Sequence, residues 1–152
     1  MDYTDIKVIQ AGELVKSFIT ISKTLAKFTL QNATSLGLTL PQMGILNAIS
    51  SSPEITLKEI TVKLQLPKST VSTTVDELVN LGLIGRKTND NDRREIKLTS
   101  TAAGAELSSK SSQNALSYRA MIYALEKMPE EDVRVLTRIH EEVLSHLQTF
   151  KY

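Results

Sequence analysis

The sequence predicts a mainly α-helical fold with one small β-hairpin, and three observations support this. Two short helical patterns, Thr56–Leu64 and about Lys68–Asn80, are separated only by Gln65-Leu66-Pro67, where proline disfavours helical backbone in the residue before it. Two short segments that resemble strands, 83–87 and 95–98, flank a polar segment, which is typical of a hairpin. Long amphipathic patterns precede and follow this region. The order helix, turn, helix and hairpin predicts a winged helix-turn-helix domain flanked by long helices.

The first flanking helix is expected to end near Gly37. Its apolar residues recur at spacings of 4, 3, 4 and 3 and form what we call the N-terminal seam: Leu14, Phe18, Ile21, Leu25 and Phe28. Thr39-Leu40-Pro41-Gln42 then starts a second helix, which Ser50-Ser51-Ser52-Pro53 closes. The apolar residues of this helix indicate burial on more than one side: Met43, Ile45, Leu46, Ala48 and Ile49. Ile55 is expected to form a brief third strand beside the hairpin.

The helix from Lys68 to Asn80 has two distinct faces. It follows a short helix that starts with a capping box, in which Thr56 and Glu59 satisfy each other's free amide groups. One stripe of the longer helix is apolar and should face the core: Val71, Val75, Leu78 and Val79. The opposite face is polar: Ser69, Thr70, Thr73, Asp76, Glu77 and Asn80. The hydroxyls lie in the N-terminal half, the end that normally enters a major groove, where they can bond base edges or phosphates.

These features indicate DNA as the partner. The expected contacts from the helix are Lys68, Ser69, Thr70, Thr73 and, at the edge of the face, Ser72. The expected contacts from the hairpin are Arg86, Lys87, Asp92, Arg93 and Arg94. An arginine at the hairpin tip can enter a minor groove, and a neighbouring aspartate can hold it extended. The alternative is that the hydroxyls face water near a helix start and that the tip is a solvated turn with a weak surface ion pair.

The last part of the sequence predicts two more helices. Thr99 or Thr101 caps a helix that we expect to continue to about Leu125, and Pro129 with three acidic residues opens the final one. Spacings of 3, 4, 3, 4 and 3 in the final helix define a C-terminal seam: Val133, Leu136, His140, Val143, Leu147 and Phe150. The two seams cover each other within one chain or are covered by a second copy. We expect a homodimer, because helix-turn-helix proteins usually bind two-fold sites as pairs.

Composition excludes several classes of protein. The chain has 152 residues and no cysteine, which rules out disulfides, cysteine-ligated zinc and cysteine redox sensing. No apolar run approaches the length of about 18 residues that a membrane span needs, and the acidic start is unlike a signal peptide, so we expect a cytoplasmic protein. The net charge is only +1, but Arg86 to Lys97 carry five basic and three acidic residues. Such a local basic segment suits contact with phosphates.

Neither a metal site nor an active site is expected. His140 and His146 are six residues apart, which separates their rings around a helix, whereas helical zinc motifs place the pair at i and i+4. Asn89-Asp90-Asn91-Asp92 lacks the glycine and the closing glutamate of a calcium loop. The glycines form no nucleophile elbow, phosphate loop or dinucleotide fingerprint. We therefore expect a protein that is not an enzyme and has no cofactor.

Residues 38–104 resemble the MarR (multiple antibiotic resistance regulator) family. The matching elements are the Leu-Thr-Leu-Pro-Gln helix start, Lys68-Ser69-Thr70-Val71-Ser72, Leu78 with Leu81-Gly82-Leu83-Ile84, the Asp92-Arg93-Arg94 wing, and Thr101 with Gly104. Two positions depart from the family pattern, since Thr73 stands where many relatives have arginine and Ser100 replaces the usual leucine. The resemblance implies an N-terminal dimerisation helix in residues 1–37, a winged helix-turn-helix DNA-binding domain in 38–100, and helices in 101–152 that complete the dimerisation domain.

The resemblance also implies a homodimer on a pseudo-palindromic operator, usually as a repressor and often released by a small anionic or phenolic ligand. For such an aromatic or anionic effector, a pocket between the helical scaffold and the DNA-binding domain is expected to involve Met43, Tyr118, Met121 and His140. Alternatively, these side chains simply fill the core and the interface. A winged helix that binds protein without binding DNA is the alternative function, but it has no need of a basic wing.

Overall fold

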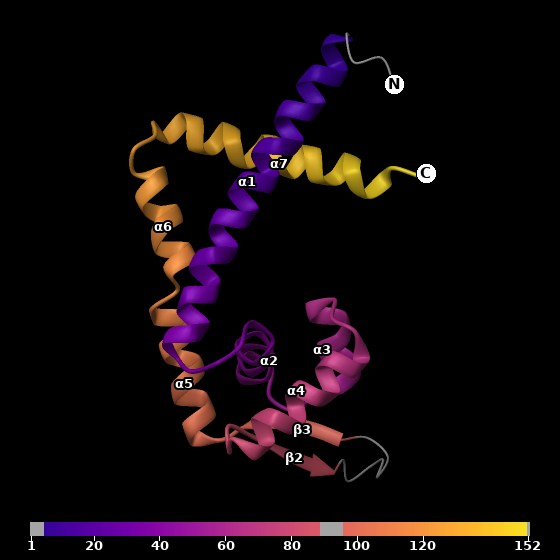
Figure 1. Ribbon diagram of the computed structural model, residues 1–152, viewed down its shortest axis with the longest axis vertical. Helices are drawn as coiled ribbons and strands as arrows, with labels where there is room; N and C mark the ends of the chain where they lie inside the picture. The colour runs from indigo at the N-terminus through magenta and orange to yellow at the C-terminus, as the bar shows by residue number, and fades with distance from the viewer. Residues whose placement is uncertain (1–4, 89–95, 152) are drawn as a thin grey trace. The chain divides into compact units, whose positions relative to one another are not determined.

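The computed structural model describes residues 5–88 and 96–151 and confirms a mainly α fold with a small β wing (Figure 1). Its elements are, in order, α1 (Ile6–Ser35), α2 (Leu40–Ser51), β1 (Ile55–Thr56), α3 (Leu57–Leu64), α4 (Lys68–Asn80), β2 (Ile84–Thr88), β3 (Ile96–Ser100), α5 (Ala102–Gln113), α6 (Leu116–Leu125) and α7 (Glu130–Thr149). The chain forms two compact units, Met1–Leu116 and Ser117–Tyr152. Within the described ranges, no helix is long and apolar enough to cross a membrane.

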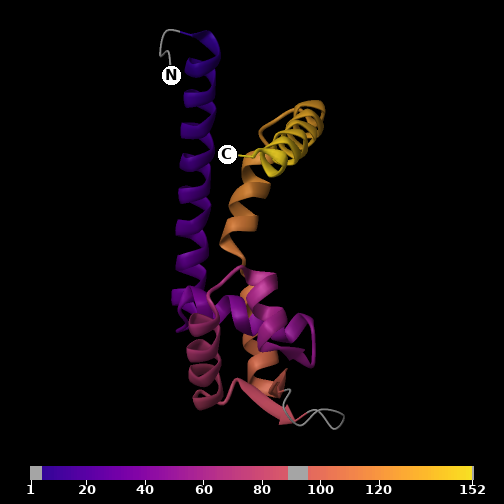
Figure 2. The same cartoon turned by 90° about the vertical axis from the view of Figure 1, so that its right-hand side faces the viewer.

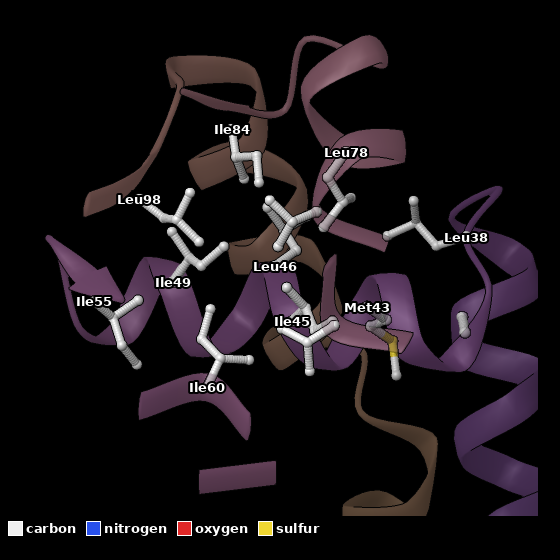
Figure 3. Packing of buried hydrophobic residues seen from close by; sticks show 13 residues of the cluster. Leu38, Met43, Ile45, Leu46, Ile49, Ile55, Ile60, Leu78, Ile84 and Leu98 are labelled. Carbon is white, nitrogen blue, oxygen red and sulfur yellow. The ribbon is translucent and has the colours of Figure 1, made fainter. Parts of the chain in front are cut away.

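The core of the first unit is built around α2, which is buried on more than one side, as its composition predicted (Figure 3). Ile45 and Leu46 of α2 are fully buried. Their neighbours in the same cluster come from every other element of the helix-turn-helix and the sheet: Ile55, Ile60, Val71, Val75, Leu78, Ile84 and Leu98. Removing a large aliphatic side chain from water contributes about 1.5–3 kcal/mol, so this cluster is the main reason that α3, α4 and the sheet pack around α2.

Local sequence signals set the boundaries of the helix-turn-helix. Capping boxes start α2 at Thr39 and α3 at Thr56, and both were predicted. In the second box the Thr56 amide donates to Glu59 Oε2 at 2.8 Å, while the Glu59 amide donates to Thr56 Oγ1 at 3.3 Å. Gln65 ends α3 in left-handed backbone with φ 51°, and Pro67 then precedes the first residue of α4. Gly82, with φ 69°, turns the chain from α4 into the sheet. Glycine adopts this backbone without steric cost.

The sheet has three antiparallel strands in the order β1-β3-β2. Ile55 pairs with Leu98, which confirms the predicted third strand. On the other side of β3, Arg86 lies opposite Leu98 and Lys87 lies opposite Lys97. Because side chains alternate between faces along a strand, Lys87 and Lys97 share one face while Arg86 lies on the other.

One predicted element is wrong: the single helix expected from Thr101 to about Leu125 is two helices. Thr101 caps α5 as predicted, but α5 ends at Gln113 and α6 begins at Leu116. The break follows a run of serines, in which the Ser112 hydroxyl donates to the Ser108 carbonyl at 3.2 Å. Asn114 closes α5 with φ −104° and ψ 24°. Serine and asparagine side chains compete for backbone hydrogen bonds, so this stretch interrupts the helix more easily than its apolar pattern suggests.

The helices that carry the two seams are long and leave apolar residues exposed. α1 runs without interruption through 30 residues (Figure 2). In the N-terminal seam, Leu14 is 56% exposed and Ile21 is 46% exposed. In the C-terminal seam, Leu147 is 67% exposed and Phe150 is 73% exposed. Within its own unit, each helix thus presents exposed apolar side chains.

Candidate nucleic-acid interface

The two faces of α4 lie as its sequence predicted. Val71, Val75 and Leu78 are fully buried against the core. The polar residues proposed as contacts lie outward or at the edge: Lys68, Ser69 and Thr73 are exposed, whereas Thr70 and Ser72 are half-buried. Thr74 is the buried hydroxyl of this helix at 5% exposure, and it was not among the proposed contacts. The exposed hydroxyls therefore form one patch at the N-terminal end of α4.

The start of α4 also presents backbone donors. Its N-cap residue is Pro67, which makes no side-chain capping hydrogen bond. The first amides of a helix have no partner within the helix, and here no capping side chain covers them. They are therefore suited to bind an anion such as a phosphate, which the positive end of the helix dipole also favours.

An ion pair connects α4 to the wing. The Arg86 guanidinium on β2 donates a hydrogen bond to the Asp76 carboxylate on α4. Asp76 lies on the polar face of α4, and the structure provides it with a cation from the neighbouring strand. Arg86 was predicted to contact DNA, and this contact stays a prediction. In the structure the pair joins the second helix of the helix-turn-helix to the sheet.

Two lysines on the other face of the sheet share one carboxylate. Glu54 Oε2 lies 2.9 Å from the Lys97 ammonium, and Glu54 Oε1 lies 3.9 Å from that of Lys87. The hydrogen bond from Lys97 lowers the pKa of Glu54, and the positive charges of Lys97 and Lys87 lower it further. Sequence reasoning missed Glu54 and did not select Lys97 as a site residue. Only the strand register could have revealed the pair, because Glu54 and Lys97 are 43 residues apart.

A buried polar network attaches α1 and α5 to α2. Asn32 Nδ2 donates to the Ser111 carbonyl at 3.0 Å, and Asn47 Nδ2 donates to Ser111 Oγ at 3.0 Å. The Ser108 hydroxyl donates to Asn47 Oδ1 at 2.9 Å. A buried polar group that loses its partner costs about 1–3 kcal/mol, so these bonds fix the two outer helices against the helix-turn-helix.

The remaining predicted site residues belong to the tip of the wing and to the expected effector pocket. Asp92, Arg93 and Arg94 lie outside the described residues. Of the predicted effector residues, Met43 is buried in the first unit, whereas Tyr118, Met121 and His140 belong to the second unit and are exposed. Two surface hollows of the first unit, beside α3 and between α2 and α5, are lined by other residues. In the described part of the chain, no group of three or more histidine, aspartate or glutamate residues could hold a metal ion.

The exposed patch of α4, the helix-turn-helix and the adjoining three-stranded sheet define a winged-helix protein. The family model described as "MarR family" matches residues 36–95. The structure of the multiple antibiotic-resistance repressor (MarR) from Listeria monocytogenes is 32% identical, covers 96% of this chain and 100% of its own, and superimposes with a TM-score of 0.68. The chain therefore belongs to the MarR family, whose members are transcription regulators and not enzymes.

Two further structures show the same fold. The Staphylococcus aureus MarR in complex with salicylate and kanamycin is 26% identical over 90% of this chain and 94% of its own, with a TM-score of 0.72. A MepR variant from the same species bound to an oligodeoxyribonucleotide is 21% identical over 88% of this chain and 97% of its own, with a TM-score of 0.60. No match was found among curated protein sequences.

Proposed function

We propose that this protein regulates transcription by binding a pseudo-palindromic DNA operator as a homodimer, acts as a repressor, and is released by a small aromatic or anionic effector. The observation that carries the proposal is the N-terminal half of α4, where exposed hydroxyls, Lys68 and uncapped amides lie together. A helix end of this kind provides donors and acceptors for base edges together with donors for phosphates. The oligodeoxyribonucleotide bound to the MepR variant supports DNA as the ligand class.

Within this interface we assign different roles to α4 and to the wing. Ser69, Thr70 and Thr73 read base edges in the major groove, since hydroxyls donate and accept and a threonine methyl can contact thymine. Arg94, in the segment outside the described residues, contributes affinity through the minor groove. Residues that contact only phosphate weaken binding to all sequences when removed, whereas residues that contact bases alter sequence preference.

The exposed seams support the proposed homodimer. α1 and α7 present contiguous apolar side chains, and such surfaces on a soluble protein usually mark an interface. Sedimentation should give about twice the chain mass of 16.8 kDa at micromolar concentration. A monomer under these conditions would contradict both the dimer and the two half-sites.

We expect the effector to be a small aromatic or anionic compound. The salicylate complex of the Staphylococcus aureus relative supports an aromatic carboxylate as its chemical class. Thermal shift measurements over a panel of aromatic carboxylates should show stabilisation by at least one compound, because a ligand that binds only the native state raises its stability. A flat response over the panel would favour the alternative that Met43, Tyr118, Met121 and His140 are ordinary packing residues.

The central experiment measures DNA binding by two variants of the reading surface. The operator is first obtained by selecting bound sequences from a random duplex pool, and fluorescence anisotropy is then measured at several salt concentrations. Arg94→Ala should weaken binding to all duplexes and flatten the salt slope by about one unit. Thr70→Ala should keep the slope and reduce discrimination at particular positions by less than the ~1–3 kcal/mol of a bidentate contact.

Arg138→Ala is the matched control for the loss of charge. Arg138 lies on α7, where it pairs with Glu142 at 3.3 Å, so its removal should leave the salt slope unchanged. If Arg94→Ala binds like the parent at every salt concentration, the wing does not contact DNA. If no duplex is retained at all, the alternative of a protein-binding winged helix is favoured.

A further inference from the structure

Glu54 has an unusual backbone conformation for its residue type. Its φ is 66°, in the left-handed region that favours glycine. Its amide donates to the Leu98 carbonyl at 3.0 Å, immediately before β1 pairs with β3. Glycine would adopt this backbone without strain, so local structure alone does not account for glutamate here. Strained positions of this kind often have a functional reason.

The side chain of Glu54 provides that reason. It reaches both lysines of the cross-strand pair, Lys97 at 2.9 Å and Lys87 at 3.9 Å. The pairs are partly exposed, and exposed ion pairs contribute little to folding stability. The lowered pKa of Glu54 agrees with a carboxylate that stays charged beside two ammonium groups. The principal effect of Glu54 is therefore to lower the net positive charge that Lys87 and Lys97 present to a ligand.

The other face of the sheet repeats this arrangement. Arg86 is bonded to Asp76, so the three cations that the structure describes on β2 and β3 all have a carboxylate partner. In the sequence, Lys87 and Lys97 each stand two residues from the segment 89–95, which contains the predicted tip of the wing. A phosphate that approaches these lysines has to compete with the carboxylate of Glu54.

We infer that Glu54 is a specificity-determining residue that limits sequence-independent DNA binding by offsetting one of the two positive charges of Lys87 and Lys97. This inference rests on the proposed DNA-binding function. With Glu54 charged, the group of three side chains carries a net charge of +1; without that charge it carries +2. Non-specific binding depends almost entirely on such charges, whereas the operator complex also has base contacts that fix its orientation. Glu54 thus weakens the non-specific complex more than the operator complex.

The test compares Glu54→Gln with Glu106→Gln. Both changes remove one exposed carboxylate that is paired with a lysine, but Glu106 lies on α5 and pairs with Lys110 at 2.7 Å. On a shuffled duplex, Glu54→Gln should steepen the salt slope of the binding constant by about 0.9. The ratio of its binding constant to that of the parent should therefore grow about 3.5-fold when the salt concentration falls from 200 to 50 mM. The gain on the selected operator should be smaller. Glu54→Gln should also elute later than Glu106→Gln from heparin, a polyanion without base sequence.

The outcomes separate this inference from the function on which it rests. If the parent binds the operator but Glu54→Gln behaves like Glu106→Gln on both duplexes and on heparin, the inference is wrong while the function stands. Weaker binding by Glu54→Gln would also overturn it, since Glu54 would then support the fold of the wing. A parent that binds no duplex refutes both. Glu54→Gly, which relieves the backbone strain, should reproduce the binding of Glu54→Gln without loss of stability.

Discussion

Gly104 allows a direct test of how α5 packs against the wing domain. Alanine is favoured over glycine by about 1 kcal/mol in a helix interior, and Gly104 lies in the first turn of α5, so propensity alone predicts that Gly104→Ala stabilises the protein by up to about this amount. However, a Cβ at this position would lie 1.9 Å from the Leu83 carbonyl oxygen and 3.3 Å from Leu46 Cδ1. The contact with the carbonyl oxygen is impossible, so α5 or the turn after α4 has to move.

The movement is costly because the carbonyl is held in place. It accepts hydrogen bonds from the Thr101 amide at 3.0 Å and from the Thr101 hydroxyl at 3.2 Å. Displacing α5 by the required distance, about 1 Å, stretches both bonds, each of which contributes about 1 kcal/mol. Overpacking of this kind costs about 1–3 kcal/mol. The clash therefore outweighs the helix propensity, and we expect Gly104→Ala to lower the free energy of unfolding by about 2 kcal/mol.

Urea unfolding at one fixed protein concentration measures this difference without a contribution from dimer dissociation by dilution. Gly44→Ala is the matched control, because Gly44 also lies in a helix and its nearest neighbour would be Leu64 Cδ1 at 4.0 Å. This variant should gain about 0.5–1 kcal/mol. A Gly104→Ala protein that is as stable as the parent would refute the reasoning. If Leu46→Ala abolished the cost of Gly104→Ala, the side-chain contact and not the carbonyl would be responsible.

The remaining predictions concern the core and the cap of α3. Leu46→Ala alone should lower the free energy of unfolding by about 2–5 kcal/mol in the same assay, since Leu46 is fully buried; a loss below about 1 kcal/mol would show that the site collapses around the cavity. The pKa of Glu59 is lowered from its usual 4.5, chiefly by hydrogen bonds from the Thr56 amide and hydroxyl. The stability from this cap is therefore present above pH 4.5 and lost as the pH falls through the lower folded pKa. Glu59→Gln should weaken this acid dependence, and a carboxyl titration by NMR at the usual glutamate pKa would contradict the prediction.

The elements that sequence predicted correctly are those with local causes. The capping boxes at Thr39 and Thr56 depend on residues three positions apart, and Pro67 restricts only its neighbour. The buried face of α4 follows from the helical period alone. The break at Asn114 is also local, but it results from a competition between side-chain and backbone hydrogen bonds that an apolar pattern does not reveal.

The parts that sequence did not predict depend on tertiary structure. Asn32 meets Ser111 across 79 residues, and nothing near either residue indicates the partner. Glu54 looks like an ordinary turn residue until the register of β1 and β3 places it beside Lys97. For the interface, the sequence identified which side chains of α4 face outward. It could not indicate that Arg86 is paired with Asp76, because that depends on how closely β2 approaches α4.

Thr56 belongs to two elements at once: it pairs with Lys97 as the last residue of β1, and it caps α3. No flexible segment therefore separates the sheet from the helix-turn-helix, and the Asp76–Arg86 pair closes the same connection from the side of α4. The wing strands and α4 are therefore expected to keep a fixed position relative to each other. In the proposed dimer, an effector can then alter the distance between the winged-helix domains of the two protomers but not the structure of either domain. An effector would therefore change which spacings between half-sites are accepted, while each half-site is read as before.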